Sequence, residues 1–178
     1  EFDSIDGESD YRHQLEGVIQ EIEKTVGTKE DQGALVVDFE YEEGEPPVML
    51  KKSDGATLYA TRDIAAAIDR WNRYAFSKSL YVVGTEQKQY FAQLKRVLSA
   101  MGHEWSENMT HVQFGRVQGM STRKGNVIFL EEVLDEAKER ALEKMKETIS
   151  GRDLDLEKVS EQVGIGGVIF GDLKNLRT

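Results

Sequence analysis

An alternation of helices and strands from residue 61 onward constrains the fold of this chain more than any other feature of its sequence. Apolar residues at three- and four-residue steps predict helices over 61–74, 86–101 and 134–145, and short apolar runs predict strands over 79–83 and 109–114. Such an alternation is typical of α/β proteins with a mainly parallel sheet. The run at 79–83 has no polar alternation, so we expect this strand to be buried on both faces.

The residues before this alternation predict a helix and a hairpin. Apolar positions over 8–26 recur at helical spacing, and Gly27 is placed to end that helix. Two apolar runs, at 34–39 and 48–51, predict strands that pair antiparallel across a turn at 42–47.

Helix starts and one close helix contact can also be predicted. Thr61 and Thr85 stand where their hydroxyls can cap the helices that follow. A last helix is predicted over 156–173, and its run Gly164-Ile165-Gly166-Gly167 is unusual inside a helix. We therefore expect these glycines to mark close packing against a neighbouring element.

The composition argues against several classes of function. The net charge of −10 over 178 residues disfavours nucleic-acid binding by the bulk surface, although a local basic loop can still touch a nucleotide or an RNA end. Cysteine is absent, and His13, His103 and His111 stand apart from one another, so no metal site is predicted. No apolar run approaches the ~18 residues of a membrane span, and no signal-peptide pattern opens the chain. We expect a cytoplasmic protein without DNA or membrane partners.

A cationic loop, Gly119–Gly125, stands out in this acidic chain. It follows a predicted strand, and its glycines allow the backbone to turn tightly. Ser121 and Thr122 supply hydroxyls, and Arg123 and Lys124 supply adjacent positive charges, which are the donors that a phosphate requires. Taken by itself, a loop of this kind favours a solvated surface hairpin over a binding site.

A second group of polar residues lies near the predicted strand ends. Parallel sheets bind ligands at the carboxyl ends of their strands, where the cationic loop and residues 84–87 both fall. Tyr59 and Asp63 are four residues apart and can face one pocket, in which the Asp63 carboxylate would pair best with a guanidinium. Gln87 can add an amide contact. The helix dipole alone would also explain Asp63 in a first helical turn, and a solvated helix start would explain Gln87.

These residues lie in sequence blocks that resemble arginyl-tRNA synthetases, a family of class I aminoacyl-tRNA synthetases. The resemblance covers most of the chain from Lys51 to Leu173, with several separated blocks in the family's order. The blocks are Asp54–Asp63, Leu80–Gln87, His111–Gly115, Gly119–Gly125 and Val163–Gly166.

The resemblance implies the second half of a Rossmann-like, nucleotide-binding α/β domain, followed by the start of a helical region. Residues 1–50 would end the connecting insertion, 51–150 would form the C-terminal half of the catalytic domain, and 151–178 would lead toward an anticodon-binding domain. The implied activity is that of an arginine–tRNA ligase, an ATP-dependent, AMP-forming enzyme. Its partners would be arginine, ATP and tRNA(Arg), with Mg²⁺ expected on ATP and no protein ligand assigned to that ion.

In the family, the loop that matches Met120–Lys124 is the Lys-Met-Ser-Lys-Ser-type loop, which closes over ATP. The residues that match Tyr59 and Asp63 hold the arginine guanidinium. The resemblance therefore implies three groups of site residues: catalytic Ser121, Thr122, Arg123 and Lys124; ATP-binding Gly84, Gln118 and Met120; and arginine-binding Tyr59, Asp63 and Gln87.

The chain departs from the family pattern in two places. Thr122 and Arg123 occupy the region of the loop's second lysine, which leaves open whether Arg123 or Lys124 meets the phosphates. The His-x-Gly-His-type motif of class I synthetases is absent from these 178 residues. We therefore expect a fragment that lacks full activity by itself and whose uncovered apolar surface favours self-association. The alternatives are a non-catalytic arginine- or nucleotide-binding or regulatory module derived from such a synthetase, and a synthetase for another amino acid.

Overall fold

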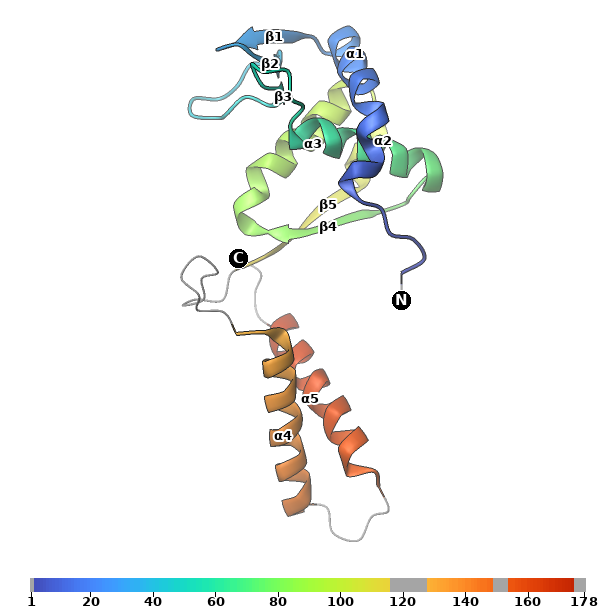
Figure 1. Cartoon of the computed structure of the whole chain (residues 1–178), viewed down its shortest axis with the longest axis vertical. Coiled ribbons are helices and arrows are strands. Elements are labelled where there is room, and N and C mark those ends of the chain that lie inside the picture. Colours follow the sequence, from blue (N-terminus) through green and yellow to red (C-terminus); the bar gives the residue numbers. More distant parts are fainter. Residues whose placement is uncertain (1, 116–127, 149–153, 175–178) are drawn as a thin grey trace. The chain divides into compact units, whose positions relative to one another are not determined.

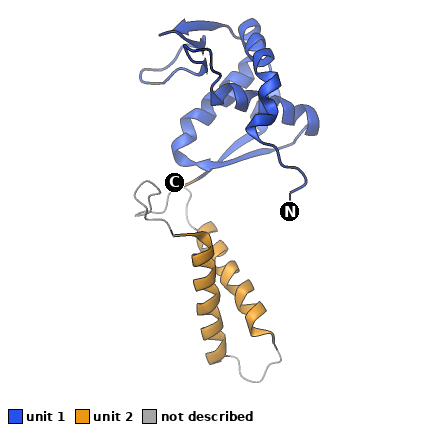
Figure 2. Cartoon of the chain, viewed as in Figure 1, with its two compact units in different colours: residues 1–113 blue, residues 114–178 orange. Residues whose placement is uncertain are grey.

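The structure, a computed structural model, describes residues 2–115, 128–148 and 154–174 (Figure 1). The chain divides into two compact units, Glu1–Gln113 and Phe114–Thr178 (Figure 2). The cationic loop, with Gln118, Met120 and residues 121–124, lies outside the described residues. The division into family domains at 50/51 and 150/151 stays a prediction.

The fold is α/β, as predicted, with β4 and β5 forming a small parallel sheet and β1, β2 and β3 a separate antiparallel one. The described elements are, in chain order, the 3-10 helix η1 (Glu8–Gln14), α1 (Leu15–Thr25), β1 (Thr28–Asp31), β2 (Ala34–Val37), β3 (Met49–Lys51), α2 (Tyr59–Tyr74), β4 (Ser79–Gly84), the 3-10 helix η2 (Thr85–Gln87), α3 (Lys88–Ala100), the 3-10 helix η3 (Glu104–Asn108), β5 (Met109–Phe114), α4 (Leu130–Thr148) and α5 (Leu156–Leu173).

The helix predicted over 8–26 is α-helical only from Leu15 onward. Before that residue the chain is a 3-10 helix. The Asp10 N–H donates to the Gly7 carbonyl at 3.1 Å, and the Gly7 N–H donates to the Asp10 carboxylate at 2.7 Å, which closes a tighter turn. Gly27 ends the helix as predicted, because its φ is +98° and its N–H donates to the Ile22 carbonyl at 2.9 Å.

The antiparallel pairing of the two predicted strands is confirmed, with Leu35 opposite Lys51 in β2 and β3. A further strand, β1, pairs with β2 and is absent from the sequence prediction, because its Thr-Lys-Glu-Asp sequence has no apolar alternation. The turn between β1 and β2 passes through Gln32 and Gly33, which both have positive φ (49° and 79°), as a two-residue hairpin turn requires.

Helix α2 begins at Tyr59, so the prediction that Thr61 caps it is wrong. Thr61 lies inside the helix, fully buried, and its hydroxyl donates to the Leu50 carbonyl at 2.9 Å. The helix starts earlier than predicted because Thr57 bridges to β3 and the Leu58 N–H donates to Leu50, which keeps the chain extended up to Leu58.

The prediction that Thr85 caps the next helix is also wrong. Thr85 opens the 3-10 turn η2, and Gly84 precedes that turn without any side-chain cap. The turn is tight because the Lys88 N–H donates back to the Thr85 carbonyl. Helix α3 therefore begins at Lys88, and Gln87 stands at its N-cap.

One face of β4 packs on helix α3 and the other is exposed. The Tyr81 ring lies 5.0 Å from the Phe91 ring of α3, whereas Leu80 and Val82 are 57% and 63% exposed. The expectation that this strand is buried on both faces is therefore wrong for the described residues. The reason is visible in Figure 1, where the helices of the first unit lie on one side of β4 and β5 and cover a single face of the sheet.

The core of the first unit lies among α1, α2, α3 and the antiparallel sheet. Its fully or almost fully buried side chains include Ile19, Ile22, Val37, Leu50, Ile64, Leu94, Val97 and Leu98. The helical members occupy the apolar stripes that the sequence spacing predicts. An aromatic contact extends this core, because Trp71 of α2 stacks on Trp105 of η3 at 5.5 Å between ring centroids.

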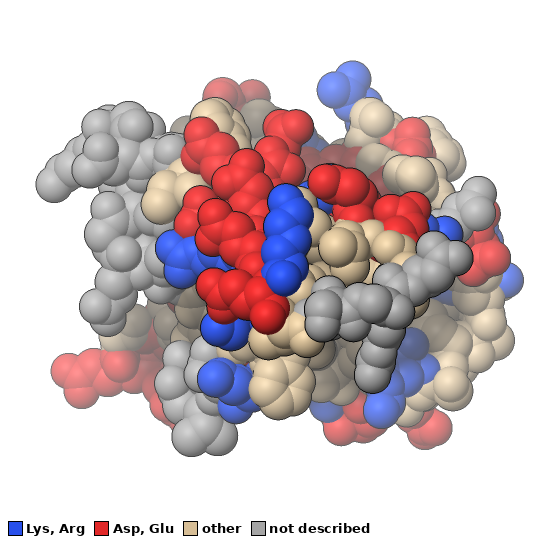
Figure 3. All heavy atoms as spheres, turned by 90° about the horizontal axis from the view of Figure 1, so that it is seen from below, with Lys and Arg blue, Asp and Glu red and all other residues tan. Residues whose placement is uncertain are grey.

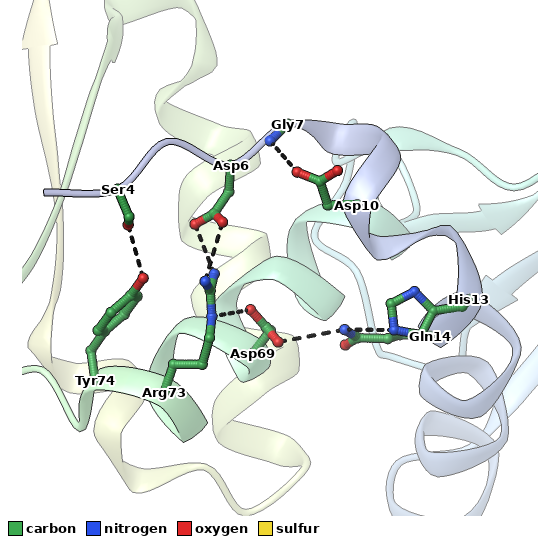
Figure 4. Close-up of polar contacts among 9 residues, drawn as sticks. All are labelled: Ser4, Asp6, Gly7, Asp10, His13, Gln14, Asp69, Arg73 and Tyr74. Atoms are coloured by element: carbon green, nitrogen blue, oxygen red, sulfur yellow. Dashed lines mark hydrogen bonds and ion pairs between the residues drawn. The ribbon is translucent and has the colours of Figure 1, made fainter. Parts of the chain in front are cut away.

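A polar cluster ties the N-terminal segment to α2 (Figure 4). Two guanidinium nitrogens of Arg73 donate to the two carboxylate oxygens of Asp6, at 3.2 and 2.7 Å, and its Nε reaches Asp69 at 2.7 Å. The Tyr74 hydroxyl also shares a hydrogen bond of 2.8 Å with Ser4. The hydrogen bond from Arg73 lowers the pKa of Asp6. The cluster thus holds the residues before η1 against the C-terminal end of α2.

The second unit is a hairpin of helices α4 and α5, and both helices are predicted from the sequence. The predicted close packing is confirmed at Gly164, where an added Cβ would lie 2.7 Å from the backbone nitrogen of Lys138 and 2.8 Å from the carbonyl carbon of Ala137. At Gly166 and Gly167 an added Cβ would meet nothing within 4 Å. One glycine therefore sets how closely α5 approaches α4.

Many acidic side chains, with some Lys and Arg side chains among them, are exposed in the view of Figure 3. This distribution agrees with the net charge of −10. Within the described ranges, none of the helices combines the length and the apolarity that crossing a membrane requires.

We expect Gly164→Ala to destabilise the helix hairpin, because its methyl group would overlap backbone atoms of α4. Overpacking of this kind typically lowers the free energy of unfolding by about 1–3 kcal/mol. Gly167→Ala is the matched control, and its higher helix propensity should leave stability equal or raise it by up to about 1 kcal/mol. Urea denaturation followed by circular dichroism measures both. Equal effects of the two substitutions would contradict the close approach.

We expect the Asp6–Arg73 pair to contribute stability at neutral pH that acid removes. The pKa of Asp6 is lowered in the folded chain, so its contribution is present above the unfolded pKa and is lost as pH falls through the folded pKa. Asp6→Asn should lower the melting temperature at neutral pH and flatten its fall below about pH 4. Asp3→Asn, a neighbouring carboxylate, is the control. A variant melting curve that follows the wild type at every pH would rule out the contribution.

Candidate functional site

Tyr59 and Asp63 lie on one face of α2, at the first and fifth residues of the helix. Because residues four apart in a helix lie above one another, both side chains project from the same side. Asp63 is half-buried, and Tyr59 is 56% exposed. Asp63 stands one turn further into α2 than the sequence predicts, since no acidic residue occupies the first turn of this helix. Stabilisation by the helix dipole, which fades after the first turn, therefore explains its position poorly.

Tyr90 of α3 joins these two residues. Its hydroxyl donates a hydrogen bond to Oδ2 of Asp63. Its ring meets the Tyr59 ring edge-on, with 5.0 Å between centroids and 64° between planes. Three side chains from two helices therefore form one cluster, which we call the tyrosine–aspartate cluster: Tyr59, Asp63 and Tyr90.

The Asp63 carboxyl group is poorly compensated. Burial raises its pKa, the hydrogen bond from Tyr90 opposes that effect, Glu8 raises the pKa further, and Arg70 lowers it. No cation forms an ion pair with Asp63 anywhere in the described part of the chain. Burial also raises the pKa of Tyr90, and the adjacent Asp63 carboxylate adds to that shift. The cluster is therefore arranged to accept a positive charge.

A cavity of about 210 Å³ opens beside the cluster, and Tyr59 and Tyr90 form part of its lining. Its other lining residues come from the chain around β3 and from the α2 and α3 starts: Pro46, Pro47, Val48, Met49, Leu58, Ala60, Glu86, Gln89 and Gln93. Asp63 is not among the residues that line it.

The other predicted residues are placed as follows. Gln87 is exposed at the N-cap of α3, three residues before Tyr90, and no hydrogen bond joins it to Tyr59 or Asp63 in the described structure. Gly84 is buried at the end of β4, and an added Cβ there would lie 2.5 Å from a carboxylate oxygen of Glu86. The predicted catalytic residues 121–124, and Gln118 and Met120, fall outside the described residues.

Tyr90 is the site residue that sequence reasoning missed. Its spacing of three from Gln87 on one helix is a usable signal, because residues three apart share a helix face. That signal is weak without a structure, since the same spacing is expected of any core-facing tyrosine near a helix start.

The carboxyl ends of β4 and β5 lie at the same edge of the parallel sheet. Gly84 ends β4 and η2 follows it at this edge, and β5 ends at Phe114, before the cationic loop in the sequence. Of the two segments that the sequence predicts to bind ligands, the described structure therefore places residues 84–87 at this edge.

Comparison with known proteins identifies the family. Residues 2–178 match the sequence profile of the family described as tRNA synthetases class I (R), catalytic domain. The chain belongs to this family. Among its relatives, an arginine–tRNA ligase of Halothermothrix orenii is 50% identical over 184 residues, which cover 99% of this chain and 32% of the relative. One of Leuconostoc mesenteroides is 48% identical over 183 residues, with the same two shares.

Solved structures of class I synthetases share the fold. The arginyl-tRNA synthetase from Plasmodium falciparum superposes with a TM-score of 0.83 at 22% identity, covering 98% of this chain and 30% of that one. The Thermus thermophilus arginyl-tRNA synthetase gives a TM-score of 0.75 at 19% identity, covering 93% of this chain and 34% of that one. The chain thus spans about a third of the length of the synthetases that it resembles.

Proposed function

We propose that this chain is the part of an arginine–tRNA ligase that selects arginine and closes over ATP. The enzyme joins the arginine carboxylate to ATP with release of pyrophosphate and passes the arginyl group to tRNA(Arg). The observation that carries the proposal is the half-buried Asp63 carboxylate, which has a tyrosine hydroxyl as its hydrogen-bond donor and forms no ion pair with a cation among the described residues.

In this proposal Asp63 and Tyr59 receive the guanidinium of arginine. A guanidinium presents donors in a planar fork, which matches a carboxylate better than an ammonium does. Gln87, at the start of α3, would contribute an amide contact once arginine is bound. Because the site is partly desolvated, a ligand without positive charge would leave the carboxylate uncompensated and would bind poorly.

The cationic loop has the second role. Ser121, Thr122, Arg123 and Lys124 would donate to ATP phosphates, where negative charge develops on the leaving pyrophosphate. Gly84, Gln118 and Met120 would contact ATP. The chemistry asks mainly for alignment of the arginine carboxylate with the α-phosphate. Mg²⁺ would be bound to the ATP phosphates. Among the described residues no three acidic or histidine side chains form a group that could hold it, so no step is assigned to a protein-bound ion.

We expect Asp63→Asn to raise the KM for arginine by about 30-fold or more, which corresponds to a loss of about 2 kcal/mol of binding. The amide keeps the shape of the side chain but loses the charge that meets the guanidinium. The KM for ATP should change little. Steady-state pyrophosphate exchange in the complete protein that carries this sequence measures both constants. Asp38→Asn, which alters a surface carboxylate, is the control. An unchanged arginine KM would remove Asp63 from the site.

We expect the 178-residue chain alone not to catalyse arginine-dependent pyrophosphate exchange, because its sequence lacks a His-x-Gly-His-type motif. The assay contains arginine, ATP, Mg²⁺ and tRNA(Arg), with a complete arginine–tRNA ligase as the positive control. Exchange by the chain at a rate near that of the control would overturn this expectation. Failure of the complete protein to catalyse exchange would instead favour a non-catalytic arginine- or nucleotide-binding module.

A further inference from the structure

Tyr90 touches both residues that the proposed function assigns to arginine. Its hydroxyl donates to Oδ2 of Asp63, and its ring packs edge-on against Tyr59. It comes from α3, whereas the other two residues come from α2. Tyr90 therefore links the two α2 residues to α3.

The hydrogen bond from Tyr90 restricts the orientation of the Asp63 carboxylate and leaves most of its lone pairs unoccupied. A carboxylate has about four lone-pair positions, and the Tyr90 hydroxyl occupies one of them. The other three remain for a ligand. Because the hydroxyl fixes one oxygen, the carboxylate plane can no longer rotate freely about its terminal bond. A planar guanidinium, which binds in a fixed orientation, gains most from a carboxylate that is already oriented.

The packing of the Tyr90 ring fixes the position of its hydroxyl and therefore the orientation of the Asp63 carboxylate. The Tyr90 ring also meets the Phe91 ring edge-on at 5.3 Å, and Phe91 in turn packs on Tyr81 of β4. Tyr90 is thus held on three sides by aromatic rings and by the Asp63 carboxylate. The hydroxyl position is set by the sheet and by α3 together.

We propose that Tyr90 is a positioning residue of the arginine site, which orients the Asp63 carboxylate and keeps it ionised for the guanidinium. This inference rests on the proposed function and adds a specificity determinant to it. Tyr90 acts through Asp63, and its hydroxyl is not assigned a contact with arginine.

The ionisation of Asp63 reflects groups on four elements. Tyr90 of α3 and Arg70 of α2 favour the carboxylate, whereas Glu8 of η1 disfavours it, and Tyr81 of β4 faces the same region. Burial opposes ionisation as well. Since a hydrogen bond to a carboxylate favours its charged form, loss of the Tyr90 hydroxyl should raise the pKa of Asp63.

The test uses Tyr90→Phe, which removes the hydroxyl and keeps the ring. Tyr74→Phe is the matched control, because it makes the same change on α2 at a hydroxyl bonded to Ser4. The first measurement is the pH dependence of the arginine KM in the complete protein that carries this sequence, with the ATP KM measured alongside. Citrulline, the neutral isostere of arginine, is the competing ligand.

We expect the acid limb of the arginine profile to move upward by about one pH unit in Tyr90→Phe, as the loss of one hydrogen bond to a charged group predicts. Near neutral pH the arginine KM should rise several-fold, the preference over citrulline should shrink, and the ATP KM should stay the same. Tyr74→Phe should reproduce the wild-type profile. An arginine KM that rises by one factor at every pH, or a profile that does not move, would overturn the proposal.

A second measurement separates this proposal from the proposed function. NMR titration of the Asp63 carboxyl carbon in the 178-residue chain without ligand reports its pKa directly, and thermal melting verifies that each variant folds. A pKa higher in Tyr90→Phe than in the wild type supports the role of Tyr90, and an equal pKa overturns it. If the wild type shows no preference for arginine over citrulline at any pH, the proposed function fails, whatever the titration shows.

Discussion

The hydrogen bond from the buried Thr61 hydroxyl to the Leu50 carbonyl fixes the geometry on which the candidate site depends. It joins the third residue of α2 to the middle of β3, and the Leu58 N–H donates to the same carbonyl. Both partners are fully buried, so breaking the bond would leave a polar group without water, at a cost of about 1–3 kcal/mol. These bonds hold the start of α2 against β3, and with it the helix face that carries Tyr59 and Asp63. The antiparallel hairpin therefore acts as the support of the site.

Much of the fold follows from patterns that sequence reasoning handles well. The helices α4 and α5, both strands of the parallel sheet and the pairing of β2 with β3 follow from apolar spacing, because burial selects those positions. The close contact at Gly164 of α5 follows from the glycine run at 164–167, because glycines lower helix propensity and so indicate close packing. The failures share a cause. Thr61 and Thr85 each look like a cap by residue type, but backbone hydrogen bonds made by Leu58 and Lys88 decide where the helices begin.

The residues of the candidate site also divide into those that the sequence predicts and one that it does not. Tyr59 and Asp63 are recognisable because spacing and a family motif coincide on them. Tyr90 belongs to no quoted family motif and its spacing from Gln87 is only a weak signal, since its role depends on how α3 packs against α2, and such contacts between elements have no local sequence pattern. The exposure of Leu80 and Val82 has a related origin. An apolar strand predicts burial on two faces, but whether a second layer covers it depends on other segments. Self-association through that surface stays a prediction.

The charged groups of the chain differ in the ligands that they would bind. The protein is acidic as a whole, and in the proposed function its cationic loop would bind phosphates while the tyrosine–aspartate cluster would offer one carboxylate to a cation. A carboxylate that selects a guanidinium over uncharged groups has to be partly shielded from water and has to stay ionised. Burial opposes the second requirement, because it raises the pKa of the carboxyl group. A neutral hydroxyl donor resolves the conflict better than a second cation would. In the proposed site, a cation paired directly with Asp63 would compete with arginine for the same oxygens, whereas the Tyr90 hydroxyl would stabilise the charge and leave the other lone pairs to the ligand.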